Sequence, residues 1–148
     1  MSGALLSLFV ALVGGVLLAA QAPTNALLGK ASGSAIVAAF ISFLIGTIAL
    51  GAAVAVTSGK LFDPGLKQVP WYAWLGGFYG AFFVAAAAFG APRVGLGVFL
   101  TAAIAGQLAA ALLVDHYGLF GLIRQPVTLT RAAGLLLILV GAVLVRKS

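Results

Sequence analysis

Charged residues are scarce in this chain of 148 residues, and several residue types that carry chemistry are missing. Only 7% of the residues are charged and 64% are hydrophobic, whereas about a quarter are charged in a soluble domain. There is no cysteine, which excludes a disulfide framework and a thiolate metal site. With no glutamate and a single histidine, we expect neither a metal nor a cofactor. The composition is that of a polytopic membrane protein.

Basic residues outnumber acidic ones, and the formal net charge is +6. An excess of this size can serve nucleic-acid binding, but here the basic residues stand singly at the ends of apolar runs and form no stripe. We interpret them as anchors to the headgroups of a lipid bilayer and expect no nucleic-acid partner. The sequence contains no Ser-His-Asp arrangement, carboxylate pair or glycine-rich nucleotide loop, so we do not expect an enzyme.

Five apolar segments are long enough to cross the hydrocarbon core, which takes roughly 17 to 25 residues. We therefore expect an all-α integral membrane protein that forms one domain over residues 1–148. The predicted spans cover about 3–28, 34–57, 70–89, 93–114 and 131–146. An arrangement with four spans would join the third and fourth into one helix much longer than a bilayer is thick.

Proline and serine residues mark the expected ends and bends of these helices. Pro23 should kink the first span. Ser34 can cap the second, and Pro70 suits the first turn of the third, where a missing N–H costs nothing. The longest polar loops are predicted at 58–69 and 115–130.

The eight lysines and arginines divide equally between the two sides of this arrangement. One side receives Lys30, Arg93, Arg146 and Lys147, and the other receives Lys60, Lys67, Arg124 and Arg131. An excess of Lys and Arg on the cytoplasmic side normally sets the orientation, so a chain without this bias should insert both ways up. Two oppositely oriented copies would generate the inverted-repeat symmetry of many secondary transporters.

Small residues spaced four apart mark contact faces of membrane helices, because they let the backbones approach closely. The second, third and fourth spans carry this spacing at Ala38, Ser42 and Gly46, at Gly76 and Gly80, and at Ala102, Gly106 and Ala110. We expect these three spans to form the tightly packed interior. The Leu-rich fifth span should lie at the periphery or at a subunit contact.

Polar residues inside the spans are the candidates for a substrate site. Gln21 and Asn25 lie one helical turn apart, with Pro23 between them, and substrate sites in transporters favour interrupted helices. Gln107 needs a partner, because an unpaired amide in hydrocarbon costs several kcal/mol, and Gln21 or Asn25 can supply one. Tyr79 is the aromatic residue that we expect in the cavity. Alternatively, the amides only link helices, at about 0.6 kcal/mol each.

Asp115 and His116 form the only acid–imidazole pair and stand where the fourth span is predicted to end. A carboxylate at this position opposes the helix dipole. The pair is therefore a candidate gate or proton relay, because histidine titrates near physiological pH. The alternative is simple residence at the interface. Arg93 joins them as a candidate that either binds an anionic group or extends to the headgroups.

Several segments spread over most of the chain carry a family resemblance. They are Gln21-Ala22-Pro23-Thr24-Asn25, Phe43-Leu44-Ile45-Gly46-Thr47, Pro70-Trp71-Tyr72-Ala73-Trp74-Leu75-Gly76-Gly77, Ala91-Pro92-Arg93, and Ala105-Gly106-Gln107-Leu108 running on to Asp115-His116-Tyr117-Gly118. With these segments the chain resembles the small five-span members of the drug/metabolite transporter superfamily, specifically the YdcZ-type exporters of the bacterial inner membrane.

The resemblance implies a secondary transporter that moves a small solute by alternating access. Larger relatives hold two inverted five-span halves in one polypeptide, which implies that this chain supplies one half and is completed by an antiparallel homodimer. Small multidrug-resistance transporters bind cations through a membrane-embedded Glu that this chain lacks, so a neutral, zwitterionic or aromatic substrate fits better. Two alternatives stay open: half of a heterodimer with a paralogue, and a non-transporting membrane scaffold.

Overall fold

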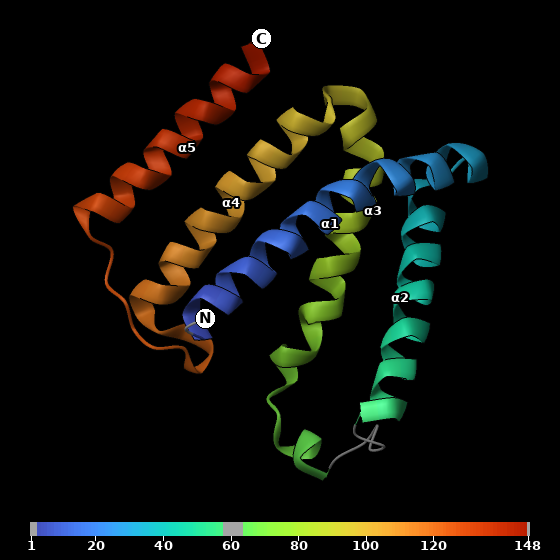
Figure 1. Cartoon of the computed structure of the whole chain (residues 1–148), viewed down its shortest axis with the longest axis horizontal. Coiled ribbons are helices and arrows are strands. Elements are labelled where there is room, and N and C mark those ends of the chain that lie inside the picture. Colours follow the sequence, from blue (N-terminus) through green and yellow to red (C-terminus); the bar gives the residue numbers. More distant parts are fainter. Residues whose placement is uncertain (1–2, 58–63, 148) are drawn as a thin grey trace. The chain divides into compact units, whose positions relative to one another are not determined.

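The computed structural model describes residues 3–57 and 64–147, and the regular structure in these segments is helical (Figure 1). The long helices are α1 Gly3–Ser32, α2 Ala35–Thr57, α3 Gly76–Val94, α4 Leu96–Tyr117 and α5 Leu129–Lys147. Short 3₁₀ helices are η1 Pro64–Gln68, η2 Trp71–Leu75 and η3 Leu119–Gly121. Five helices, with η2 and α3 taken together, are long and apolar enough to cross a membrane. The predicted all-helical class with five spans is confirmed.

Large apolar side chains point outward in this fold, and small ones form its interior. Leu12, for example, is 68% exposed, as expected where the surrounding solvent is lipid. The buried apolar residues in the described segments are Val84 and the alanines Ala22, Ala38, Ala39, Ala87, Ala88, Ala91 and Ala105. Because lipid tails are as apolar as leucine, close approach of the backbones holds such helices together.

Residues Met1–Pro92 form one compact unit, in which α1 packs against α2. The chain turns between the two helices at Gly33, whose φ of +71° favours glycine. Helix α1 reaches Ser32, four residues beyond the predicted end, and keeps Pro23 inside it. The backbone N–H of Val37 donates to the Ser34 hydroxyl at 3.3 Å, so the predicted cap of the second helix is confirmed.

The connection from α2 to α3 is partly described. Residues 58–63, which include Lys60 and Asp63 of the predicted loop, lie outside the described residues. Pro70 is extended, with φ −62° and ψ 146°, and directly precedes η2. It therefore caps the first turn and does not occupy it, and its carbonyl accepts the N–H of Ala73 at 3.0 Å.

The boundary between α3 and α4 lies later in the chain than predicted. The third span is predicted to end at about residue 89 and the fourth to begin at about 93, whereas α3 continues through Pro92 to Val94 and α4 begins at Leu96. Pro92 removes the hydrogen bond that its own nitrogen would donate, and its ring crowds the carbonyl four residues earlier, yet the helix continues for two more residues. The helix ends before Gly95, whose φ of +88° is a conformation that glycine adopts without steric strain. This break separates two spans where a four-span arrangement would have one.

Residues Arg93–Ser148 form the second unit, in which α4 packs against an antiparallel α5 (Figure 1). The beginning of α4 meets the end of α5, since the Cβ position of Gly97 lies 3.8 Å from Cγ1 of Val145. Helix α4 ends at Gly118, which has a φ of +62° and donates its N–H to the carbonyls of Val114 and Asp115. The 19 residues of α5 exceed the predicted span at both ends.

Candidate functional site

One face of α1 carries the predicted amide pair against α2. Gln21, Asn25 and Gly29 are spaced by four residues and so share this face. The Gln21 Nε2 donates to the hydroxyl of Ser42 at 3.3 Å. Two turns further along, the Cβ position of Gly29 lies 3.7 Å from the Cβ of Ala38. Asn25 lies between these two contacts, in the interface of α1 and α2.

Asn25 is the buried polar residue of the described segments, with 3% of its surface exposed. Its Nδ2 has no hydrogen-bond partner among residues 3–57 and 64–147. An unpaired buried donor costs about 1–3 kcal/mol, and each such group in a native structure calls for an explanation. The amide of Asn25 is therefore free to donate to an acceptor that the described residues do not supply.

The other two residues of the predicted substrate site are more exposed. Tyr79 on α3 is 66% exposed. Gln107 on α4 is also exposed and has no hydrogen bond to a described residue. Gln21 bonds to Ser42, and its predicted pairing with Gln107 stays a prediction. The structure thus brings Gln21 and Asn25 together in one unit, whereas Gln107 belongs to the other.

The residues predicted to pack helices divide into two groups. Ser42 accepts the Gln21 bond, and Ala102 lies in a groove between α4 and α5. Gly80 lies on the ring of Phe43, whose Cζ is 3.1 Å from its Cβ position. The other predicted packing residues, Gly46, Gly76 and Gly106, have nothing within 4 Å of their Cβ positions. Their role in packing stays a prediction.

The predicted interior of second, third and fourth spans stays a prediction, and the helix pairs that pack are described within each unit. Within the first unit, α1 is the main neighbour of α2, and within the second unit α5 is the main neighbour of α4. Helix α1 is therefore a packing partner of α2, and α5 is a packing partner of α4. The spacing of small residues alone did not indicate these two pairs.

The Asp115 carboxylate, at the end of α4, is held by residues that follow it in the chain. Its Oδ2 lies 3.4 Å from Nη1 of Arg131, the first basic residue of α5. Arg131 also donates to the backbone carbonyl of Gln125 at 3.3 Å and to the Gln125 side-chain oxygen. The N–H of Gln125 in turn donates to the Asp115 carbonyl at 2.7 Å. This ion pair offsets the unfavourable position of a carboxylate at a helix C-terminus.

His116 ties the same connection to α4 through its ring and its carbonyl. The N–H of Val127 donates to Nδ1 at 3.1 Å, so this nitrogen acts as an acceptor. The carbonyl accepts a bond from Nε of Arg124 at 3.0 Å. The ring meets Tyr117 edge-on, with centroids 4.8 Å apart.

Sequence reasoning identified Asp115 and His116 but missed the residues that bind them. From the sequence, Arg124 and Arg131 were considered only as charges on one side of the membrane, and Gln125 only as part of the loop 115–130. The signal that was available is the carboxylate opposing the helix dipole, which asks for a cation nearby. Arg93 does not join this cluster, because the 22 residues of α4 place about 33 Å between them at about 1.5 Å per residue.

Comparison with known families gives one match. The family model described as "Putative inner membrane exporter, YdcZ" matches residues 6–144. No curated protein and no solved structure matches the chain. The matched range includes most or all of each of the five helices, so it applies to both units of the fold.

Proposed function

Because the chain belongs to the YdcZ family of inner membrane exporters, we propose that it moves a small solute by alternating access, as an antiparallel homodimer of five-helix subunits. The family is one of transporters and not of enzymes. The solute is bound by Gln21, Asn25, Tyr79 and Gln107, and Asp115 with His116 forms a gate at the end of α4. No cofactor takes part.

The unpaired Nδ2 of Asn25 is the observation that carries this proposal. A donor that is costly in the empty protein recovers that cost when a solute supplies an acceptor. Gln21 lies one turn away on the same face, so a solute with two acceptor oxygens meets two amides. The described spans hold no acidic side chain in this interface, which favours a neutral or zwitterionic solute over a cation.

The exposed amide of Gln107 supports the proposal that a second subunit completes the transporter. An amide without a partner is unfavourable in hydrocarbon, and a second chain can cover it. The open faces at Gly46, Gly76 and Gly106 admit close approach of another helix. The equal division of basic residues between the two sides allows the two copies to insert in opposite orientations.

Export can be tested before the solute is known. Cells that express the wild type or an empty vector are compared by untargeted mass spectrometry of the medium, and compounds enriched by the wild type are followed. Asn25→Ala and Gln107→Ala should abolish the enrichment. Thr24→Ala is the matched control, because the Thr24 hydroxyl bonds the Gln21 carbonyl of its own helix at 2.8 Å. A membrane scaffold would show no enrichment, or would keep its function in all three variants as long as it assembles.

The orientation of the chain in the membrane can be tested by labelling a single introduced cysteine, because the chain has no cysteine of its own. Gln68→Cys introduces one thiol at an exposed position of η1, and intact cells are treated with an impermeant thiol reagent. About half of the molecules should react if the chain has no preferred orientation. Complete or absent labelling would favour a heterodimer with an oppositely biased paralogue. Two lysines added on one side should abolish export unless an oppositely biased copy is co-expressed.

A further inference from the structure

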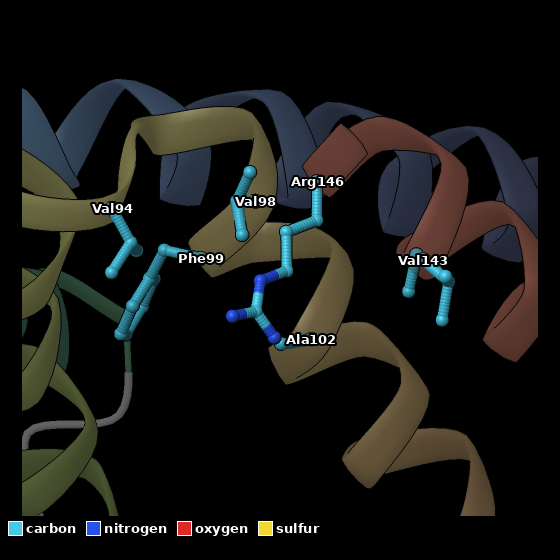
Figure 2. Close-up of a pocket in the computed structure, with 7 residues that line it drawn as sticks. Val94, Val98, Phe99, Ala102, Val143 and Arg146 are labelled. Carbon is cyan, nitrogen blue, oxygen red and sulfur yellow. The ribbon is translucent and has the colours of Figure 1, made fainter. Parts of the chain in front are cut away.

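An apolar groove with a single cation lies between α4 and α5, within the unit Arg93–Ser148 (Figure 2). We call it the α4–α5 groove, and its walls include Val94, Val98, Phe99, Ala102, Val143 and Arg146. Its volume is about 570 Å³, within the range of about 300–1,000 Å³ that small-molecule sites occupy. It opens where α4 begins and α5 ends, so one end of it lies at the surface of a bilayer.

The cation in this groove is the guanidinium of Arg146, which has no partner among the described residues. Arg124 and Arg131 are hydrogen-bonded to neighbouring residues, and Arg93 has an interaction of its own. Arg146 has no hydrogen bond or ion pair to any residue of 3–57 or 64–147. Figure 2 shows its guanidinium turned across the groove toward Ala102 of α4, although an arginine at a helix end usually extends outward to the headgroups.

The charge and the walls together define the chemistry of the occupant. A guanidinium binds phosphate in a bidentate manner and stays charged at any physiological pH. The valine, alanine and phenylalanine walls require an apolar chain that continues from the anionic group. Basic pockets between membrane helices hold anionic headgroups in this way. Inorganic phosphate has no apolar part and would leave the walls uncovered.

We propose that the α4–α5 groove binds an anionic phospholipid, with the headgroup phosphate on Arg146 and an acyl chain along Val98, Ala102 and Val143. The groove shares no residue with the proposed solute site, and the proposal does not require that the chain transports anything. Any bilayer covers the groove with lipid, so the content of the proposal is selectivity for the anionic headgroup over a zwitterionic one.

Native mass spectrometry of the full-length protein in neutral detergent measures this selectivity. The protein is mixed with equal amounts of phosphatidylglycerol and phosphatidylcholine of the same acyl length, and the retained lipids are counted. The wild type should prefer phosphatidylglycerol, and R146Q should lower the preference roughly fivefold, because it loses the bidentate contact between the guanidinium and the phosphate. K147Q is the matched control, because it removes the same charge from the next residue and should change the preference less than twofold.

Three outcomes would overturn the proposal. Equal losses in R146Q and K147Q would mean that net charge alone attracts the lipid. Equal retention of the two lipids by the wild type would mean that the groove does not select, and this result decides the matter even if R146Q fails to fold. Displacement of phosphatidylglycerol by inorganic phosphate would mean that the acyl chain contributes nothing.

A second variant tests the apolar wall separately from the charge. Ala102 is an exposed alanine in the groove, so Ala102→Leu narrows it while Arg146 stays. Retention of phosphatidylglycerol should fall by a similar factor. Unchanged retention would place the lipid elsewhere. A disulfide between two copies of Val143→Cys that forms equally well with and without lipid would mean that a second subunit fills the groove.

Discussion

The amide of Asn25 leads to a prediction in which stability and activity change in opposite directions. Asn25→Leu replaces a buried side chain by an apolar one of similar branching and removes the unpaired Nδ2. The unpaired donor costs about 1–3 kcal/mol. Removing this donor should therefore stabilise the protein. Crowding of the leucine against the alanines of α2 offsets part of the stabilisation, because close contacts such as that of Gly29 with Ala38 leave little room. We expect a net stabilisation of about 1 kcal/mol and the loss of export.

Ser42→Ala is the matched control in the same interface. It removes a hydroxyl that is in use and leaves Nε2 of Gln21 unpaired. Hydrogen bonds between membrane helices contribute about 0.6 kcal/mol on average and up to about 1.7 kcal/mol. Ser42→Ala should therefore destabilise the protein by about 1 kcal/mol. The two substitutions, in the same interface between α1 and α2, should thus change the free energy of unfolding in opposite directions.

Both variants can be measured by unfolding in mixed micelles with increasing dodecyl sulfate, followed by the fluorescence of Trp71 and Trp74 in the same unit. A destabilisation of more than about 1 kcal/mol by Asn25→Leu would refute the reasoning. It would mean that Nδ2 is bonded in the assembled protein, so that the asparagine connects subunits or helices and does not wait for a solute.

Three further predictions concern other parts of the fold. Arg131→Gln should speed amide hydrogen exchange over 122–128 roughly two- to fivefold, since the lost ion pair is about one-third exposed and contributes about 0.5–1 kcal/mol; unchanged exchange would contradict the role of the pair in the connection. Gly118→Ala should destabilise by about 1–2 kcal/mol because of its positive φ, whereas Gly134→Ala, helical and with open space around it, should be neutral or stabilising in the same micelle titration. Ala88→Leu, at a buried position, should lower stability by about 1–3 kcal/mol through overpacking, and a neutral result would mean that the alanine-lined interior is loose.

The number and type of the helices follow from the sequence because they depend on sums along the chain. An apolar run either is or is not long enough for the hydrocarbon core, and five runs are. The serine cap at Ser34 was equally readable, since a cap acts within three residues. The family resemblance rests on the same short segments and is confirmed over residues 6–144.

Two local effects compete to set the end of α3 before Gly95. Pro92 indicates the end of a helix, because it removes one hydrogen bond and crowds the carbonyl four residues earlier. In a membrane, every backbone group that leaves a helix needs another partner. The helix therefore continues until glycine supplies a conformation that other residues adopt at a cost. Neither residue alone indicates which effect is larger.

The pairing of side chains across helices was decided by the tertiary structure. The spacing of Gln21 and Asn25 places them on one face, but it does not say that Gln21 finds Ser42 while Asn25 is buried unpaired. The ion pair of Asp115 and Arg131 likewise joins residues 16 positions apart. These contacts depend on how each helix is rotated about its axis, and a helix that is apolar all around has no polar stripe to indicate its inward face. Length and hydropathy determine that this chain crosses a membrane five times, whereas the close approach of small residues on particular faces decides which polar groups are satisfied and which stay free to bind.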